Sequence, residues 1–373
     1  MQNYRRFFPI VKHKVYLNHA ATSPVSTKVK EALDEHYSTR MNREPGNWEH
    51  SMEVASELRT MCARMINADS GDRIAFTRNT TQGLNIIASG LNWKEGDEIL
   101  IPEKEFPANV FPFKNLEKRG VKIKFMATPG GGLDPATLKS NITENTRLLT
   151  LSFVEFLSGY KHDMETIGQI CRDEDIVFIV DSIQGLGAIP LDVKKFHIDG
   201  LANGGHKWLM APPGTGFLYI TRELQDRINQ VHMGWTGLEN FEDFLDYDRK
   251  PVKTAARYEL GSLNFAGITG AHASLALLIK AGIEDIYQHL IDLTTYAIRE
   301  LKSLGFNIYT NENLKHRSGI ITFYPDQGAP ELFELLQDHN IVCSLRSNMI
   351  RIAPHFYNNQ GDIKRLLEVC KRF

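Results

Sequence analysis

Apolar and polar residues alternate along the chain in two periods, one typical of helices and one of buried strands. Helical spacing marks residues 51–66 and 79–91, and polar capping residues open the second of these segments. Short apolar runs typical of strands occur at 73–76, 98–101, 121–126, 148–154, 176–181 and 216–220. Most of these runs lie about 20–30 residues apart, as crossover connections between parallel strands require. The pattern predicts an α/β fold with helices packed on a mostly parallel sheet.

The C-terminal part of the chain has a different pattern. Residues 264–305 have long helical segments that are broken near Gly282. Shorter strand-like and helical segments alternate after them, at 319–325, 331–339, 341–346, 349–354 and 362–373. We therefore expect an N-terminal arm at 1–15 that packs near the small domain, a large domain at 16–263, and linking helices with a smaller α+β C-terminal domain at 264–373.

Composition and charge narrow the classes of function. The 373 residues suit two domains of roughly 100–200 residues each. A net charge of −2 with no basic stripe gives no reason to expect a nucleic-acid or membrane partner. We find no secretion signal and no apolar run of about 18 residues. The four cysteines have no metal-ligand spacing, so we expect no metal and a cytoplasmic setting.

Two residues of the central segment carry the expected chemistry. Asp181 ends a very apolar predicted strand, where open α/β sheets place their ligand-binding groups. A buried carboxylate in that position needs a cationic partner. Lys207 lies in a glycine-rich turn between His206 and Trp208, and a Pro-Pro-Gly-Thr-Gly turn follows it. We expect this lysine to be held in place rather than to move freely in solvent.

A fixed lysine and a carboxylate together suit a pyridoxal phosphate enzyme. A lysine whose pKa is lowered by desolvation or by a nearby cation can form a Schiff base with a carbonyl cofactor. The carboxylate then keeps the pyridine nitrogen protonated, which strengthens the ring as an electron sink. Taken singly, Asp181 could equally be a helix cap and Lys207 a surface turn residue.

The surrounding motifs favour the enzyme, because the chain resembles the class V aminotransferase and cysteine desulfurase family of pyridoxal 5′-phosphate (PLP) enzymes, which have the type I fold. The matching blocks are YLNHAATSPVS (16–26), NTTQGLN (79–85), DSIQGLGAIPLDV (181–193), GGHKW (204–208) and RIAPHFYN (351–358). They occur in the right order and span nearly the whole chain. The resemblance implies a large PLP-binding domain and a smaller C-terminal domain.

The resemblance also implies how the cofactor is held. Lys207 would form the Schiff base and shuttle protons, Asp181 would pair with the pyridine nitrogen, and Gln184 would bond to the ring hydroxyl. His206 would reach the phosphate. Phe106, in EFPAN (105–109), would stack over the ring, although a lone phenylalanine is more often a core residue.

Three further residues would hold the cofactor phosphate. Thr80 and Thr81 stand at the predicted N-terminus of a helix, where hydroxyls and free backbone amides bind anions. A simple N-cap is the alternative for this segment. Ser262, in YELGSLNFAG (258–267), resembles the residue with which one subunit completes the phosphate site of the other, which implies a homodimer with shared sites.

The substrate is expected to be a small amino acid. Arg351 matches the arginine that binds the substrate α-carboxylate in related enzymes, where a planar guanidinium suits a bidentate contact. A surface salt bridge is the alternative role. Asn18 and His19 are expected near the substrate, without an assigned chemical role.

These motifs leave the reaction open, since one PLP scaffold supports transamination, epimerisation, elimination and desulfuration. A desulfurase needs a mobile cysteine in a loop shortly before the carboxylate-binding arginine, but IVCSLRSNMIR (341–351) leaves little room for one. Cys343 falls within a predicted strand. Phe156 also stands where desulfurases of this group usually carry asparagine. We favour aminotransferase or epimerase-type chemistry, with a cysteine desulfurase, selenocysteine lyase or other PLP β-lyase as the alternative.

Two other classes of protein fit the sequence poorly. A nicotinamide-dependent dehydrogenase would need a GxGxxG turn after a strand, and GLGAIP (185–190) does not provide it. A non-catalytic interaction protein of this fold would normally have lost Lys207 or Asp181, and the chain keeps both.

Overall fold

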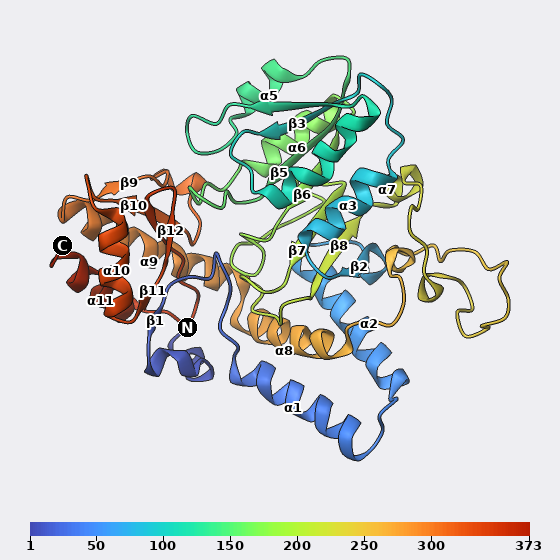
Figure 1. Ribbon diagram of the computed structural model, residues 1–373, viewed down its shortest axis with the longest axis horizontal. Helices are drawn as coiled ribbons and strands as arrows, with labels where there is room; N and C mark the ends of the chain where they lie inside the picture. Colours follow the sequence, from blue (N-terminus) through green and yellow to red (C-terminus); the bar gives the residue numbers. More distant parts are fainter.

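A seven-stranded sheet lies at the centre of the larger unit of the molecule (Figure 1). The computed structural model describes the backbone of residues 1–373 and all of their side chains except that of Gln2. The strands of this sheet are β2 (Ile74–Thr77), β3 (Glu98–Pro102), β4 (Lys122–Met126), β5 (Thr146–Ser152), β6 (Val177–Asp181), β7 (Gly200–Gly204) and β8 (Gly216–Ile220). Their order across the sheet is β2-β8-β7-β6-β5-β3-β4. Neighbours from β7 to β4 are parallel, whereas β8 is antiparallel to β7 and β2, so the predicted mostly parallel α/β sheet is confirmed.

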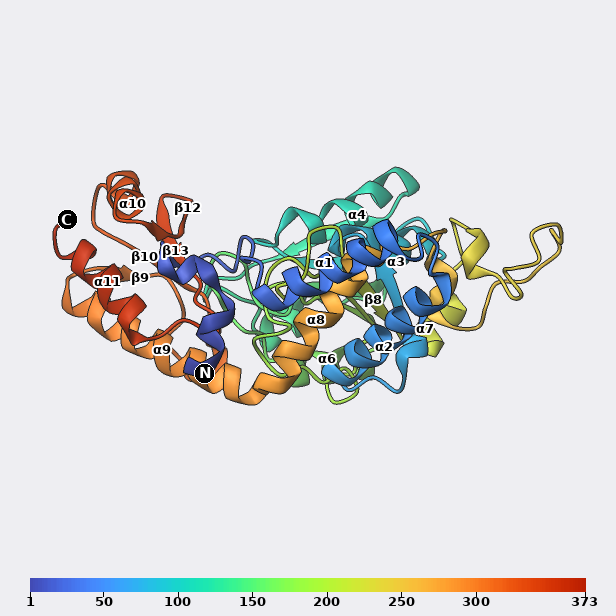
Figure 2. The same cartoon turned by 90° about the horizontal axis from the view of Figure 1, so that it is seen from below.

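Helices cover both faces of this sheet (Figures 1 and 2). One face shares an apolar core with α2 (Trp48–Met65), α5 (Pro135–Asn141), α6 (Met164–Asp173) and α8 (Phe265–Ala281). The opposite face is covered by α3 (Thr80–Gly90), α4 (Phe111–Lys114) and α7 (Arg222–Arg227). The long α1 (Thr27–Asn42) packs on α8. Because both faces are buried, successive side chains of a strand enter different cores, and the strands are continuous apolar runs in the sequence.

Polar residues fix where several of these helices begin. The Asn79 side chain accepts a hydrogen bond from the Gln82 amide at 2.9 Å and caps α3. Asp163 caps α6 in the same way. Such side chains satisfy backbone amides that have no partner within the helix, and each contributes about 1 kcal/mol. The predicted start of the helix at 79–91 is confirmed.

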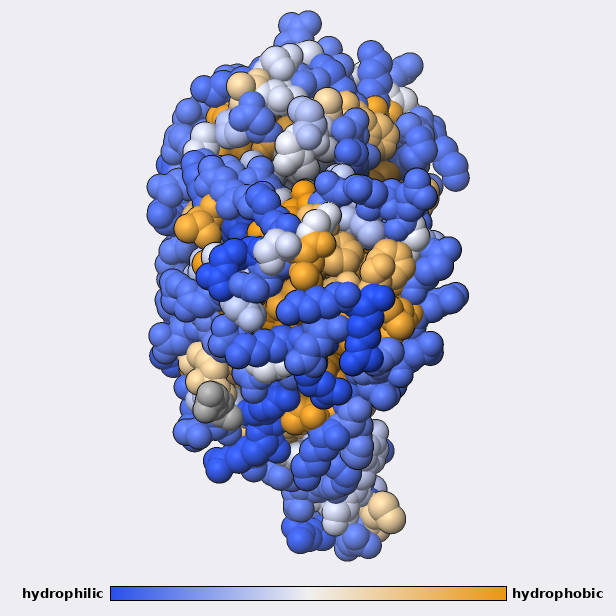
Figure 3. All heavy atoms as spheres, turned by 90° about the vertical axis from the view of Figure 1, so that its left-hand side faces the viewer, coloured by the Kyte–Doolittle hydropathy of each residue, from blue (hydrophilic) through white to orange (hydrophobic). Residues whose placement is uncertain are grey.

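The smaller unit is built from the C-terminal part of the chain. Its antiparallel sheet has the order β12-β13-β10-β9. The strands are β9 (Asn307–Ile308), β10 (Ile321–Tyr324), β12 (Ser344–Arg346) and β13 (Met349–Ile352), and the helices are α9 (Ile283–Ser303), α10 (Ala329–Asp338) and α11 (Gln360–Cys370). They enclose an apolar core of their own. Figure 3 views the molecule from this end, where polar residues cover most of the surface and apolar ones gather near the middle.

The N-terminal segment crosses to the smaller unit. After two short 3₁₀ turns, β1 (Val15–Tyr16) pairs in parallel with β11 (Ile341–Val342). Arg5 also makes a two-pronged contact with Asp362 of α11, at 2.7 and 2.9 Å. The N-terminal segment therefore forms a separate two-stranded sheet with β11 and contacts the last helix of the smaller unit.

The two units are linked by α8 and α9, which bend by 74° at Gly282. Gly282 has a φ of 82°, a backbone conformation that favours glycine, and this explains the break expected there. Among the helices described, none is by itself long and apolar enough to cross a bilayer. Only α8 and α9 counted together, as one bent pair, are long and apolar enough for a membrane span.

Candidate active site

A cavity of about 300 Å³ opens where the carboxyl ends of the parallel strands face the smaller unit. Seven of the residues predicted from the sequence line it: Thr80, Thr81, Phe106, Gln184, His206, Lys207 and Arg351. They come from five separate stretches of the chain. The fold thus brings together most of the residues to which the sequence motifs assigned a role.

Lys207 projects from the turn that follows β7 and is 7% exposed. Its Nζ lies 5.2 Å from the centre of the Phe106 ring. The pKa of Lys207 is lowered to about 8, chiefly by burial; Asp181 opposes this effect, and the charges of Arg351 and Arg346 add to it. A lysine with such a pKa has an appreciable fraction of neutral, nucleophilic amine near neutral pH.

Asp181 is the last residue of β6 and is 1% exposed. Its Oδ1 accepts a hydrogen bond from the Ile183 amide at 2.9 Å. Oδ2 finds no hydrogen-bond partner among the groups described. Burial raises the pKa of Asp181 to about 6, while the Ile183 bond and Lys207 lower it. A buried oxygen without a partner is costly, so this atom is suited to a ligand that donates a hydrogen bond.

The N-terminus of α3 forms the opposite end of the cavity, at Thr80 and Thr81. The first backbone amides of a helix and its dipole attract anions. The buried Thr80 hydroxyl also has no hydrogen-bond partner among the described residues. His206 lies nearby, and burial lowers its pKa, which favours the neutral imidazole. This end is suited to a phosphate group bound mainly by neutral donors.

Two aromatic rings form another wall of the cavity. Phe106 and Phe156 contact each other edge to face, with ring centres 5.3 Å apart. The sequence analysis placed Phe106 over the cofactor ring, and here its ring faces the Lys207 amine. A flat apolar ring above a reactive amine can stack on a planar ligand bound there.

Arg351 brings a buried positive charge into the cavity from β13. It is 3% exposed, and its Nη1 donates to the Phe156 carbonyl at 2.6 Å. Its Nε is buried without a partner among the residues described. Burial lowers the pKa of Arg351 to about 10, with a further contribution from Arg346, so the guanidinium is still charged at neutral pH. It is suited to bind a carboxylate.

Arg346 also lines the cavity, although the sequence analysis did not single it out. Ser347 and Asn348 both have positive φ and form the two-residue turn of the β12–β13 hairpin. The pairing of Arg346 with Met349 and of Ser344 with Arg351 places both arginines on one face. This could have been found from the sequence, because two-residue hairpin turns fix the alternation of the flanking residues.

Gln184 is tied into the cavity wall. Its amide nitrogen donates to the Ala20 carbonyl at 3.0 Å, and its amide oxygen accepts from the Trp208 indole at 3.0 Å. The second N–H of the amide remains available to a ligand. Gln184 thus connects the N-terminal segment with the residue that follows Lys207.

Asn18 and His19 do not line the cavity, whereas the adjacent Ala20 and Ala21 do, so their expected place near the substrate stays a prediction. His19 is fully buried, with one ring nitrogen bonded to the Ala353 carbonyl and the other to the Tyr357 hydroxyl. Burial lowers the pKa of His19 well below its usual value, with a further contribution from His355. The side chain of Asn18 accepts a hydrogen bond from Ser344. Both residues fasten the N-terminal segment to the smaller unit.

Ser262 also lies outside this cavity within one chain. It lines a second cavity of about 420 Å³ beside the first, together with Gly205 and Thr215. This position neither supports nor opposes the expectation that Ser262 serves the site of another subunit.

Cys343 is buried in the core of the smaller unit. Burial raises the pKa of its thiol to about 12. A weak contact from Gln337 at 3.9 Å is the one polar neighbour recorded for its sulfur among the described side chains. The prediction that Cys343 is a buried structural thiol without an activating cation is confirmed.

The groups without partners fit PLP and an amino acid together. Asp181 Oδ2 suits a ring N–H, the Thr80 hydroxyl and the start of α3 suit a phosphate, and Arg351 Nε suits a carboxylate. Lys207 stands among them with a lowered pKa. The site therefore meets the requirements of that cofactor on the basis of its own geometry.

Comparisons with known proteins agree with this geometry. The family model for aminotransferase class-V matches residues 15–366. A probable cysteine desulfurase of Methanothermobacter thermautotrophicus is 30% identical over 99% of this chain and 97% of its own length. An uncharacterised aminotransferase of Bacillus subtilis is 26% identical over 98% of this chain and 96% of its own.

Solved structures with the same fold include PLP enzymes. The apo cysteine desulfurase of Thermococcus onnurineus has a TM-score of 0.91 at 27% identity, covering 99% of this chain and 97% of that one. A lysine-to-alanine variant of C-DES, with glycine covalently linked to its PLP cofactor, also has a TM-score of 0.91, at 25% identity and 99% coverage of both chains.

Proposed function

The chain belongs to the class-V aminotransferase family, and from this premise we propose that it catalyses aminotransferase or epimerase-type chemistry at the α-carbon of an amino acid. It is a PLP-dependent enzyme of the type I fold. The observation that supports the proposal most directly is the lowered pKa of the buried Lys207 beside Asp181, whose second oxygen has no partner among the described groups.

We assign the cofactor-binding roles as the sequence suggested. Lys207 would bind the cofactor aldehyde, Asp181 its ring nitrogen, and Thr80 with the first amides of α3 its phosphate. When bound, the pyridoxal ring supplies an electron sink for a bond broken at the substrate α-carbon. With the cofactor bound, Asp181 would favour a protonated ring nitrogen, and the neutral amine of Lys207 would accept or return the substrate proton at Nζ.

The substrate would enter from the side of the smaller unit. Arg351 and Arg346 share one face of the β12–β13 hairpin and line the same cavity as Lys207, and the charge of each lowers the pKa of that lysine. No ion pair neutralises either arginine among the described residues. We propose that the α-carboxylate of the substrate binds Arg351 and that Arg346 adds to the attraction for this anion.

A cysteine desulfurase or another PLP β-lyase is the second candidate, because relatives with 30% identity carry the desulfurase name. A thiolate relay would need an exposed cysteine with a low pKa near Lys207. The four cysteines are free and buried, and none of them lines the cavity. Their burial as free thiols is also in keeping with the cytoplasmic setting that we propose.

Sulfur chemistry can be tested with one substitution. Wild-type protein and Cys343→Ala would be incubated with cysteine and with cystine, and sulfide, alanine and pyruvate would be measured. We expect Cys343→Ala to keep most of the activity on the true substrate. Strong desulfuration by the wild type that is lost in Cys343→Ala would reject the preferred chemistry in favour of a desulfurase.

We further propose that the enzyme is a homodimer with shared sites. The segment between α7 and the residues near 260 protrudes from the large unit (Figure 1), and it carries exposed apolar side chains. They are Val231, Met233, Trp235, Phe244, Leu245, Tyr247 and Leu260. Such a concentration of exposed apolar residues is typical of an interaction surface. The adjoining Ser262 would then reach the phosphate site of the other subunit.

The reaction can be identified by a screen of amino acids with the PLP-loaded protein. A keto acid with the cofactor left in its amine form would show transamination, and inversion of the α-carbon without a keto acid would show epimerisation. Pyruvate with ammonia would show elimination. An absence of any spectral change with all amino acids, in protein that binds PLP through Lys207, would refute an amino-acid substrate.

A further inference from the structure

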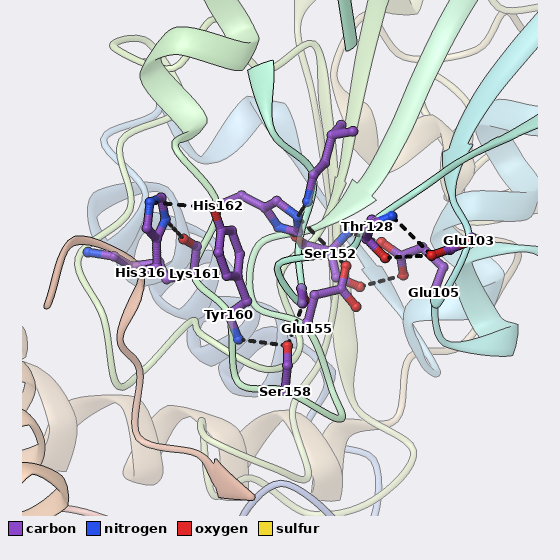
Figure 4. Close-up of polar contacts among 12 residues, drawn as sticks. Glu103, Glu105, Thr128, Ser152, Glu155, Ser158, Tyr160, Lys161, His162 and His316 are labelled. Atoms are coloured by element: carbon purple, nitrogen blue, oxygen red, sulfur yellow. Dashed lines mark hydrogen bonds and ion pairs between the residues drawn. The ribbon is translucent and has the colours of Figure 1, made fainter. Parts of the chain in front are cut away.

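Figure 4 shows Glu105 and Glu155 together with the polar side chains around them. Glu105 directly precedes Phe106, and Glu155 directly precedes Phe156. Both glutamates are buried, with exposures of 8% and 3%. The roles assigned so far use neither of them, so their burial needs an explanation.

Glu105 connects two separate parts of the site. Its Oε1 accepts a hydrogen bond from the backbone amide of Ser152, the last residue of β5, and its Oε2 accepts from the Ser152 hydroxyl at 2.7 Å. Oε2 also accepts from the Phe106 amide at 3.1 Å. One carboxylate therefore receives two donors from the end of a central strand and one from the residue whose ring faces Lys207.

The anchor at Ser152 is itself rigid. The Ser152 carbonyl accepts a hydrogen bond from His162 Nδ1 at 2.8 Å, and His162 Nε2 in turn accepts one from the Leu133 amide at 2.9 Å. These two bonds fix the imidazole in its neutral form, and burial lowers the pKa of His162 to about 4. A second contact joins the same loop to β5, because Thr150 donates to the Asn109 side chain at 2.6 Å.

Glu155 differs from Glu105 in its contacts. No hydrogen bond to its carboxyl group is present among the side chains and amides described, and its Oε1 lies 3.7 Å from a nitrogen of His162 that already accepts a bond. Burial raises the pKa of Glu155 well above its usual value, and the charges of Glu105 and Asp181 add to the effect. We treat Glu155 as a neutral acid. Glu105 is the side chain that connects the Phe106 loop to the end of β5.

We propose that Glu105 is a positioning residue of the active site: its carboxyl group latches the loop that carries Phe106 onto the end of β5 and so holds the Phe106 ring in place over the Lys207 amine. This inference rests on the proposed function only in taking the cavity to be the PLP site. The contact between Glu105 and Ser152 is present in the chain without its cofactor. An experiment on the cofactor-free protein can therefore reject the role of Glu105 without rejecting the proposed function, and the reverse.

The charges and contacts around Glu105 act on it in opposite directions. Burial raises the pKa of Glu105 to about 7, Asp181 on β6 adds to this, and the hydrogen bonds from Ser152 and Asn109 oppose it. Glu155 after β5 and Lys104 on the same loop are the other ionisable groups at this cluster. The three donors that contact Glu105 favour its carboxylate form, in which both oxygens can accept.

The test compares Glu105→Gln with a neighbouring control, Glu103→Gln. Glu103 accepts hydrogen bonds from the amide and hydroxyl of Thr128, at 3.0 and 3.4 Å, so it makes the same kind of contact without reaching Phe106 (Figure 4). Amide hydrogen exchange would be measured at Phe106, Ser152 and Thr128 in the cofactor-free protein, and PLP affinity would be measured by titration.

We expect Glu105→Gln to raise the exchange rate of the Phe106 or Ser152 amide roughly tenfold, since an amide side chain can accept from only one of these two backbone donors. PLP affinity should fall severalfold. Glu103→Gln should change exchange only at Thr128, and Glu155→Gln should leave Phe106 unchanged. Unchanged exchange and PLP affinity in Glu105→Gln, or equal effects of Glu103→Gln at Phe106, would overturn the proposal.

Discussion

At the residue scale, the reactivity of Lys207 is governed by the charges around it. Burial and two arginines lower the pKa of Lys207 to about 8 from its usual value of 10.5. The reaction of the cofactor-free enzyme with PLP should therefore speed up as the pH rises and level off above about 8. Arg346→Gln removes a positive charge, so it should raise the pKa of Lys207 and move this midpoint upward. Stopped-flow absorbance across pH measures both effects.

The control for this prediction is Arg365→Gln, at an exposed arginine of α11 that does not line the cavity. Arg365→Gln should leave the pH midpoint of the PLP reaction unchanged from that of the wild type. An equal shift in both variants would mean that a general change in charge, rather than the position of Arg346, controls Lys207.

Asp181→Asn removes the negative charge that acts on Lys207. Asp181 raises the pKa of Lys207, so its replacement should move the midpoint of the PLP reaction downward. Turnover should fall while PLP stays bound, because a neutral amide no longer favours the protonated ring nitrogen. Visible absorbance gives the bound cofactor and steady-state kinetics give the turnover number. An unchanged turnover number would reduce Asp181 to a structural cap of the Ile183 amide.

Arg351→Leu should weaken the binding of substrates that carry an α-carboxylate. Hydrogen bonds to a charged group contribute about 1.5–3 kcal/mol, which corresponds to a rise of about 10–150-fold in the Michaelis constant. Simple amines without a carboxylate are the comparison, and their reaction should change little. Equal damage to both would indicate that the Arg351 contact with the Phe156 carbonyl matters mainly for folding.

At the scale of elements, close packing overrides local propensity in α6. Glycine weakens helices, and replacing it by alanine at an exposed site stabilises them by about 1 kcal/mol. At Gly168, however, an added Cβ would lie 1.8 Å from the Phe196 carbonyl oxygen. We expect Gly168→Ala to lower the free energy of unfolding by about 1–3 kcal/mol through overpacking. At Gly130, where no described atom lies within 4 Å, alanine should have little effect; urea denaturation compares the two.

The sequence predicted the elements whose patterns are local. The strand at 176–181 and the helix at 79–91 were found from an apolar run and from the cap at Asn79. In contrast, β7 was missed, because Gly200–Gly204 has few apolar side chains and is a strand only through its pairing with β6 and β8. The strand predicted at 341–346 is two strands, since β11 pairs with β1 and β12 with β13. Pairing between distant segments is not encoded in any one window of sequence.

The residues of the candidate site also divide into those that a local motif predicts and those that depend on contacts between distant segments. The motifs expected to bind the cofactor are short and contiguous, so Asp181, Lys207 and Thr80 could be singled out from the sequence. The contacts of His19 could not, because they join it to Ala353 and Tyr357, more than 300 residues away. Glu105 was passed over because the Ser152 groups that donate hydrogen bonds to it lie on β5, and no sequence spacing relates Glu105 to Ser152.

At the scale of the whole molecule, the active site depends on more than one unit. Lys207 and Asp181 come from the large sheet, whereas Arg351 and Arg346 come from the small one. The N-terminal segment contacts the smaller unit through β1 and Arg5, and its Ala20 carbonyl accepts a hydrogen bond from Gln184 of the large unit. A change in this segment can therefore alter the site without touching it. If the two units moved relative to each other about the bend at Gly282, both arginines would move relative to Lys207.

A larger question at this scale is whether one chain completes its own site. Ser262 lies in a neighbouring cavity in the single chain, and we have proposed that it serves the partner subunit.

Mixing two impaired variants tests whether Ser262 serves the partner subunit. Lys207→Ala removes the reactive amine from one chain, and Ser262→Ala weakens the phosphate site. In a mixed dimer with crossed sites, the Lys207→Ala chain lends its intact Ser262 to the site of the other chain, which retains Lys207. That site is then wild type in composition. Random exchange of subunits at equal amounts would make half of the dimers mixed, so about a quarter of all sites should recover. PLP affinity and turnover, measured after exchange, should both show this fraction. If Ser262 instead serves its own chain, mixing would restore nothing, and the shared-site dimer would be rejected even if the protein is found to be dimeric.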